Sequence, residues 1–274
     1  MSRDPDRHTL VERFRGLHVP GRPLTMPNPW DLGSARILQT LGAQALGTTS
    51  AGFAGSRGRP DGRVAREDAL AHAAELAAAV YVPVSADLEN GFGDSPQAVA
   101  ETVRRAAEVG LAGCSIEDWD PVGERTYDVS LAVERVAAAA EVARSATHPL
   151  VLTARADGAF HGEPDLDDAV RRLVAFADAG ADVVYAPGYD GLTQLHTLVE
   201  AVAVPLNVLA LPGAPSVGEL ASIGVARVST GSGLYWAAMG GLVTAARELF
   251  DRGSYTYWRG AAVGREEGRR AFGG

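Results

Sequence analysis

Short apolar runs alternate with longer alanine-rich stretches along the chain. The apolar runs have the length and residue types of buried strands, and the alanine-rich stretches have helical spacing. The predicted strands cover residues 24–28, 45–50, 82–87, 113–118, 150–156, 182–187, 205–210 and 227–230. Segments such as REDALAHAAELAAAV and SPQAVAETVRRAAEVG follow them as predicted helices. The pattern therefore predicts eight consecutive strand–helix units.

Eight such units in 274 residues predict one (β/α)8 (TIM) barrel domain over residues 1–274. A doubly wound open sheet is the alternative fold, and we rank it second because no G-x-G-x-x-G motif opens the first helix. The tail, at about residues 250–274, is rich in aromatic and basic residues. This tail is either a surface helix or a helical arm that packs on another subunit.

Composition narrows the possible functions. The net charge of −9 argues against a nucleic-acid partner, because phosphate binding needs a basic surface. No apolar run reaches 18 residues, and the first residues are too polar for a secretory signal, so we expect a cytoplasmic protein with no membrane partner. Cys114 is the single cysteine, and we expect it in the core. All 25 basic residues are arginine, which excludes Schiff-base catalysis by lysine.

Charged side chains follow three neighbouring predicted strands. Asp87 and Glu89 end the third strand in VSADLENGFG, Glu117 ends the fourth in SIEDWD, and Arg155 and Asp157 end the fifth in TARADG. In a TIM barrel these positions meet at one mouth. Carboxylates gathered there repel one another unless they share a cation or take up protons. Oxygen ligands suit Mg²⁺ or Mn²⁺, and an arginine can bind a carboxylate or phosphoryl group.

Other strand ends carry neutral polar groups. Thr49 and Ser50 follow the second strand among small residues, a sequence that can present backbone N–H groups to an anion. Asp61 lies in the glycine-rich loop GSRGRPDGR, and Asn207 lies on the seventh strand. Together with a metal and Arg155, these groups suit a small 2-oxo acid. The metal would stabilise the negative charge of its enolate as a Lewis acid.

These segments, in this order, resemble the isocitrate lyase/phosphoenolpyruvate mutase superfamily over nearly the whole chain. The matching segments are PNPWDLGSARIL, TTSAGFA, GRPDG, ADLENGFG, SIED and TARAD. The resemblance implies that Asp87 is the principal Mg²⁺ ligand and that Glu89 and Glu117 hold the metal mostly through water. It also implies catalytic roles for Arg155, Glu117 and Asp61, with Arg155 binding the substrate carboxylate or phosphoryl group.

The resemblance also implies a substrate pocket and an assembly. Backbone groups near Ser50 and Ala51 would hold the substrate carboxylate, Trp30 and Thr49 would line the pocket, and Asn207 would lie on the far side of the substrate. Family barrels exchange their last helix between subunits, often in tetramers. We therefore expect a homo-oligomer, a dimer of dimers, with a swapped C-terminal helix.

The segment after the fourth strand departs from the family. The lyases carry a cysteine there as the acid and the mutases an asparagine–serine pair, but EDWDPVGERTYDVS contains neither. Asp120, Glu124 and Arg125 lie in it instead. Tyr127 and His161 are alternative acids, and for both we favour a plain structural role, Tyr127 as a solvated loop residue and His161 as a surface residue.

Three functional hypotheses remain. The first is an Mg²⁺-dependent lyase or mutase for a small 2-oxo or 2-hydroxy carboxylate, such as phosphoenolpyruvate, phosphonopyruvate or oxaloacetate. It would form or cleave a C–C or P–C bond, and we rank it above a methylisocitrate lyase with a different acid. The second is a non-catalytic metabolite binder that keeps the Mg²⁺ pocket. The third, which we rank last, is a barrel whose strand-end charges serve only as caps and ion pairs.

Overall fold

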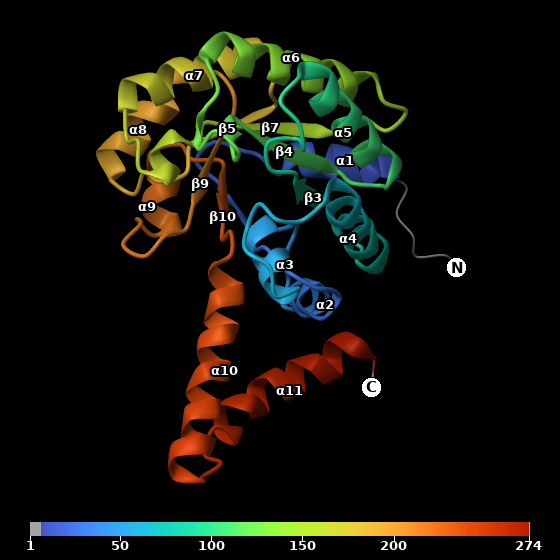
Figure 1. The fold of residues 1–274 in the computed structure, drawn as a ribbon, viewed down its shortest axis with the longest axis vertical. Coiled ribbons are helices and arrows are strands. Elements are labelled where there is room, and N and C mark those ends of the chain that lie inside the picture. Colours follow the sequence, from blue (N-terminus) through green and yellow to red (C-terminus); the bar gives the residue numbers. More distant parts are fainter. Residues whose placement is uncertain (1–6, 274) are drawn as a thin grey trace.

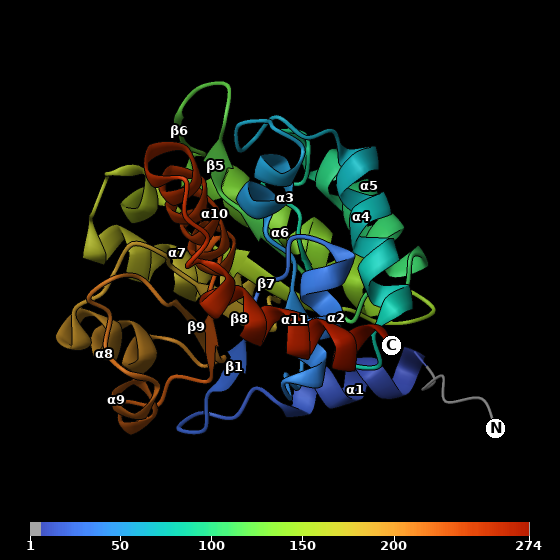
Figure 2. The ribbon, with the colours of Figure 1, turned by 90° about the horizontal axis from the view of Figure 1, so that it is seen from below.

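The computed structural model describes residues 7–273, in which eight parallel strands form a nearly closed barrel (Figures 1 and 2). The strands are β1 (Leu24–Met26), β2 (Leu46–Gly47), β3 (Val84–Asp87), β4 (Gly113–Glu117), β7 (Val151–Arg155), β8 (Val183–Tyr185), β9 (Leu206–Leu209) and β10 (Arg227–Ser229). Their order is β1-β10-β9-β8-β7-β4-β3-β2. The Gly47 N–H donates to the Pro27 carbonyl at 3.1 Å and links the two ends of the sheet. The predicted barrel is confirmed, with strands shorter than predicted.

Helices surround the barrel and connect successive strands (Figure 2). They are α2 (Leu32–Thr40), α3 (Ser50–Ser56), α4 (Arg66–Ala79), α5 (Pro96–Glu108), α6 (Val129–Ser145), α7 (Leu166–Asp178), α8 (Leu192–Ala201) and α9 (Val217–Ser222), with a 3₁₀ turn, η1 (Gly158–His161), before α7. Asp31, Ser95, Asp165 and Ser216 each precede a helix and accept a hydrogen bond from the backbone N–H three residues later. These caps fix where the helices begin, close to the barrel mouth.

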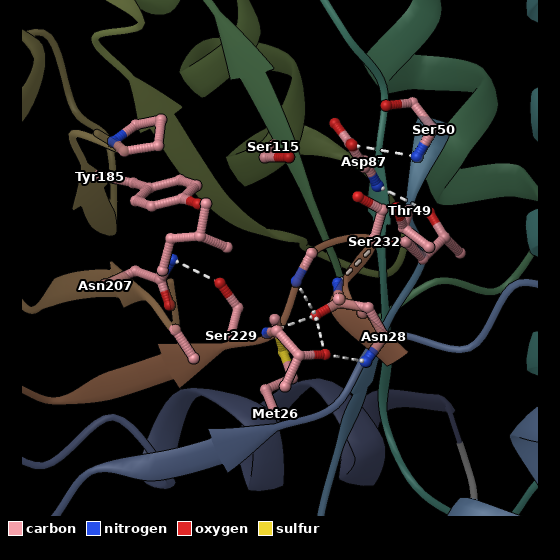
Figure 3. A pocket seen from close by; sticks show the side chains of 18 of the residues that line it. Met26, Asn28, Thr49, Ser50, Asp87, Ser115, Tyr185, Asn207, Ser229 and Ser232 are labelled. Atoms are coloured by element: carbon pink, nitrogen blue, oxygen red, sulfur yellow. Dashed lines mark hydrogen bonds between the residues drawn. The ribbon is translucent and has the colours of Figure 1, made fainter. Parts of the chain in front are cut away.

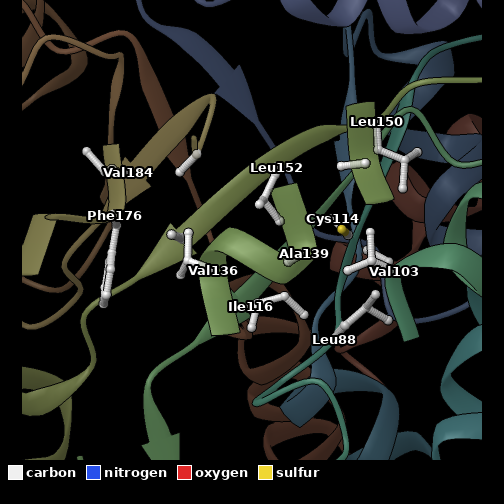
Figure 4. Packing of buried hydrophobic residues seen from close by; sticks show 14 of the residues in the cluster. Leu88, Val103, Cys114, Ile116, Val136, Ala139, Leu150, Leu152, Phe176 and Val184 are labelled. Atoms are coloured by element: carbon white, nitrogen blue, oxygen red, sulfur yellow. The ribbon is translucent and has the colours of Figure 1, made fainter. Parts of the chain in front are cut away.

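Two apolar clusters hold the barrel together. The larger cluster lies between the strands and the surrounding helices, and Figure 4 shows Leu88, Ile116 and Leu152 packed within it. Cys114 belongs to this cluster and is fully buried, as expected, and burial raises the pKa of its thiol to about 12. The smaller cluster packs helix α1 (Arg7–Gly16) against the strand starts through Phe14. Helix α1 therefore covers the barrel end opposite the mouth.

A short antiparallel hairpin rises beside the barrel mouth and was not predicted. It consists of β5 (Trp119–Asp120) and β6 (Arg125–Thr126), which follow β4. The Asp120 carboxylate closes its turn by accepting the backbone N–H groups of Val122 and Gly123, each at 2.9 Å. Its strands are too short and too polar for hydrophobic alternation to reveal them.

The last two helices extend away from the barrel. Helix α10 (Gly233–Arg252) projects from the mouth, and α11 (Trp258–Phe272) turns back toward α2 (Figure 1). Several large apolar side chains of this arm are exposed, namely Trp236, Leu242, Val243, Leu249, Phe250, Tyr255, Trp258 and Val263. Residues 1–6 and 274, the two ends of the predicted domain, lie outside the described residues. No helix in the described part of the chain is long and apolar enough to span a membrane.

Candidate active site at the barrel mouth

Arg155 lies at the centre of the mouth and contacts three carboxylates. Its Nη1 is 3.0 Å from Asp87 Oδ1 and 3.0 Å from Glu117 Oε2, and its Nη2 is 2.7 Å from Asp157 Oδ2. Asp87, Glu117 and Arg155 are the last residues of β3, β4 and β7, which are neighbours in the sheet, and Asp157 follows β7. The structure therefore brings Asp87, Glu117 and Arg155 together, and it adds Asp157 as a bidentate partner of the guanidinium.

The start of α3 holds Asp87. The Ser50 N–H donates to Asp87 Oδ2 at 3.2 Å, and the Asp87 N–H donates to Thr48 Oγ1 at 2.9 Å (Figure 3). Thr49 caps α3 by accepting the Gly52 N–H at 3.2 Å. The N-terminal end of α3 thus supplies a hydrogen bond to Asp87 itself, whereas the sequence predicted that backbone groups here would hold the substrate carboxylate.

Trp30 and Ala51 were also predicted to contribute to the substrate pocket. Neither residue lines the central cavity. Trp30 packs edge-to-face on Tyr235, with ring centroids 5.7 Å apart. A Cβ atom at Gly52 would approach Trp30 Cβ to 3.2 Å, so the start of Trp30's side chain lies close to the first turn of α3. The assignment of Trp30 to the pocket wall stays a prediction, and in this structure its ring packs on Tyr235.

Glu89 and Glu117 occupy environments that favour the protonated carboxyl group. Burial, together with the negative charges of Asp87 and Asp61, raises the pKa of Glu89 to about 8. Burial also raises the pKa of Glu117 well above its usual value, although Arg155 opposes this effect. Glu89 has a left-handed backbone with φ of 49°, and its carbonyl accepts the Glu117 N–H at 3.0 Å. A cation at this place would offset the repulsion among these acidic groups.

Two adjoining cavities open at the mouth. The first has a volume of about 460 Å³, and in Figure 3 Tyr185 and Asn207 lie on the opposite side of it from Asp87 and Ser50. The second has a volume of about 570 Å³ and includes Glu89 and Glu117 in its wall. Residues that line both cavities are Ser50, Asp61, Arg155 and Phe160. Asp61 is exposed, on the loop at this shared edge. Within residues 7–273, no three histidine, cysteine or acidic side chains are placed to hold one metal ion together.

A buried network supports Arg155 from behind. The Asp157 N–H donates to Asp118 Oδ1 at 2.8 Å, and Asp118 Oδ2 pairs with Arg172 Nη1 at 3.0 Å. Arg172 also donates to the Tyr127 carbonyl at 2.8 Å. Burial raises the pKa of Asp118 to about 6. The sequence had placed Asp157 at a strand end without a site role, and the only available signal was its position two residues after Arg155.

Tyr127 is buried, so its assignment as a solvated loop residue is wrong. Its hydroxyl donates to Asp94 Oδ1 at 2.7 Å and accepts from Asn90 Nδ2 at 3.0 Å. The Arg135 guanidinium lies 4.2 Å from the ring centroid, on the face of the ring. Burial raises the pKa of the Tyr127 hydroxyl to about 12. The sequence could not reveal this, because the partners come from the loop after β3 and from α6.

His161 is exposed, but one face of its ring is covered. Its ring stacks on Trp119 of the hairpin, with centroids 3.7 Å apart and planes 2° apart. Its Nε2 lies 4.0 Å from Asp157 Oδ2, and the ring lines the second cavity. His161 is therefore a surface histidine, as predicted, although the unpredicted hairpin covers one face of its ring.

An eight-stranded parallel barrel with an acidic cluster and an arginine at its mouth defines a class of α/β-barrel enzymes. Comparison with known proteins identifies the family within this class. The phosphoenolpyruvate phosphomutase family model matches residues 14–250. The chain belongs to the phosphoenolpyruvate mutase/isocitrate lyase superfamily, as its sequence motifs had indicated.

Individual relatives cover most of the chain. A crystal structure from Burkholderia cenocepacia, described only by the class lyase/mutase, has a TM-score of 0.92 and 47% identity and covers 96% of this chain and 95% of that one. An uncharacterised protein of Mycobacterium tuberculosis is 36% identical over 87% of this chain and 89% of its own length. The 2-methylisocitrate lyase of Escherichia coli is 31% identical over 73% of this chain and 69% of its own. Of these three relatives, the two whose descriptions give an activity are a lyase and a protein of the lyase/mutase class.

Proposed function

We propose that this protein is an Mg²⁺-dependent lyase or mutase that acts on a small 2-oxo or 2-hydroxy carboxylate through an enolate. The convergence of Asp87, Glu117 and Asp157 on Arg155, beside a cavity of about 460 Å³, carries this proposal. The cavity has the size of a small-molecule site. Phosphoenolpyruvate, phosphonopyruvate and oxaloacetate are substrates of suitable size and charge.

The donor set fits Mg²⁺, with Mn²⁺ as an alternative. Asp87, Glu89 and Glu117 offer oxygen ligands only, and their arrangement suits an ion that keeps several waters and takes few direct carboxylates. When bound, the ion would supply Lewis-acid stabilisation of negative charge on the substrate oxygens. Asp87 is the best direct ligand, because the Ser50 N–H already fixes its carboxylate. Glu89 and Glu117 would act mainly through water.

The protein groups orient the substrate and exclude water. Arg155 is held rigid by Asp157 through two hydrogen bonds of 2.7 and 3.1 Å, so its remaining edge is presented in a fixed direction. A substrate carboxylate or phosphoryl group bound there would compete with Asp87 and Glu117 for Nη1. Asn207 faces the opposite end of the substrate. Asp61 lies at the opening and would approach the substrate from the loop side.

The acid that protonates the enolate separates the possible reactions. Trp119 and His161 occupy the wall near Glu117, and the segment after β4 that contains Trp119 lacks the lyase cysteine. This difference supports a mutase, a decarboxylase or a lyase for another 2-oxo acid over methylisocitrate cleavage. A non-catalytic binder that keeps the Mg²⁺ pocket is the alternative that the missing cysteine also supports.

A turnover screen with Mg²⁺ tests the proposal. The panel contains phosphoenolpyruvate, phosphonopyruvate, oxaloacetate, methylisocitrate and alkylated malates, with pyruvate or oxalate release as the readout. We expect turnover of one of these that requires Mg²⁺ and disappears in Asp87→Ala. Tight Mg²⁺-dependent oxalate binding without any turnover would instead support the binder. If Asp87→Ala keeps both binding and turnover, the assignment of Asp87 as the metal ligand is overturned.

We also propose that the protein works as a homo-oligomer, a dimer of dimers, in which the arm formed by α10 and α11 packs on a neighbouring subunit. The support is the row of exposed apolar side chains on the arm, including Phe250 with 80% of its surface exposed. Apolar surface of this extent favours burial against another protein surface.

A further inference from the structure

Two arginines line the first cavity, and their surroundings differ sharply. Arg155 lies within hydrogen-bonding distance of Asp87, Glu117 and Asp157, so three carboxylates compete for its positive charge. Arg227 is 2% exposed and, among the residues that the structure describes, forms no ion pair with a carboxylate. Of the two arginines, Arg227 is therefore the one whose positive charge no carboxylate of the described residues neutralises.

The hydrogen bonds of Arg227 all go to neutral groups. Its Nε donates to Asn207 Oδ1 at 2.9 Å, its Nη2 donates to Thr153 Oγ1 at 3.0 Å, and its Nη1 lies 3.0 Å from His18 Nε2. Burial lowers the pKa of His18 to about 3, so the ring is neutral and accepts this bond. Its other nitrogen, Nδ1, lies 2.8 Å from the Phe14 carbonyl and can donate to it.

Arg227 remains charged in this environment. Burial lowers its pKa to about 10, which still leaves the guanidinium protonated at neutral pH. A buried charge without an opposite charge costs free energy, and hydrogen bonds to neutral acceptors recover only part of it. An anion in the cavity would supply the missing negative charge.

The contact with Asn207 gives Arg227 a second effect. Because Nε donates to Asn207 Oδ1, the Asn207 amide is fixed with its Nδ2 directed to Ser229 Oγ, at 2.9 Å (Figure 3). Nδ2 has a second hydrogen, which is a donor for a ligand in the cavity. The sequence had singled out Asn207, and the structure shows which group orients it.

We propose that Arg227 is the buried counter-charge for an anionic substrate of this site and that it positions Asn207 toward that substrate. This inference rests on the proposed function, because it needs an anion in the first cavity. It adds that the cavity selects ligands with negative charge at both ends. Arg155 and the metal would hold one end, and Arg227 would stabilise the other through Asn207 and by its charge.

Substitutions at Thr153 test the charge of Arg227 without removing the arginine. Thr153 is fully buried, bonds Arg227 and does not line the cavity. Thr153→Asp places a carboxylate on the guanidinium, and Thr153→Asn is the neutral control of the same shape. The probes are oxalate and oxamate with excess Mg²⁺, measured by calorimetry, because they have similar shapes and differ by one negative charge.

We expect Thr153→Asp to weaken oxalate binding about tenfold, since a unit charge about 10 Å away has roughly that effect at an effective dielectric constant of about 20. Oxamate should lose less, and Thr153→Asn should stay within about twofold of the wild type for both. If Thr153→Asp does not fold, Arg227→Gln, which keeps an N–H donor for Asn207, should show the same preferential loss of oxalate. Equal losses for oxalate and oxamate, or none, would overturn the role of Arg227 alone. No oxalate binding by the wild type would overturn the proposed function and this inference with it.

Discussion

The raised pKa of Glu89 predicts that the metal-free protein loses stability as the pH rises. The carboxyl group titrates near pH 4.5 in the unfolded chain and at about 8 in the folded protein. Between these values the folded state keeps a proton that the unfolded state has released. The folded state therefore binds more protons, and the free energy of unfolding falls with increasing pH.

The size of this loss follows from the two pKa values. Between pH 6.5 and 8.5 the difference in proton binding integrates to about 1.4 pH units, or about 2 kcal/mol at 1.36 kcal/mol per unit. Glu89 is partly open to the cavity, so solvent screening makes this value a ceiling. His18 and His72, whose pKa values burial lowers to about 3 and 4, act in the opposite sense, because both are half protonated in the unfolded chain at pH 6.5. Together they offset about 0.8 kcal/mol of the loss over this range.

Urea unfolding at pH 6.5 and 8.5, in the presence of a chelator, measures the effect. We expect the wild type to lose about 1 kcal/mol over this range and Glu89→Gln to lose clearly less. Saturating Mg²⁺ should remove most of the loss, and Mg²⁺ affinity should rise with pH because metal and proton compete. A wild type whose stability is flat between these pH values would refute the argument. A slope that survives in Glu89→Gln would assign the proton to Glu117 instead.

Three further predictions concern the fold and the assembly. Gly47→Ala should destabilise the protein by about 1–3 kcal/mol in urea unfolding, because its Cβ would lie 2.8 Å from Asn28 Nδ2. A neutral result would mean that the Asn28 side chain can move aside at no cost. Arg172→Met should cost about 3–5 kcal/mol, because it leaves the buried Asp118 carboxylate unpaired, whereas Asp118→Asn should cost less. Phe250→Asp should reduce the oligomer size seen by light scattering without changing the far-UV circular dichroism, and an unchanged mass would remove this part of the arm from the interface.

The barrel could be predicted from the sequence because each strand is a short apolar run between helical segments, and this rhythm depends only on neighbouring residues. Asp87, Glu117 and Arg155 could be placed together for the same reason, since the ends of neighbouring parallel strands meet. Arg227 could not be recognised in this way. It lies inside a strand, and its significance comes from the carboxylates that are missing around it, which only the packed barrel reveals.

The side chain of Arg135 contacts both the base of the hairpin and the loop after β3. This contact limits which parts of the barrel mouth can change in sequence without moving the acidic residues. Arg135 donates to the Gly93 carbonyl at 2.7 Å and lies on the ring of Tyr127, which directly follows β6. The base of the hairpin is therefore fixed to the loop that carries Glu89. The turn between β5 and β6 is exposed, with Val122 at 91%, and within residues 7–273 it makes no such bond to the loop after β3. Changes in that turn can alter which substrates reach Glu117 while the positions of the acidic residues stay the same.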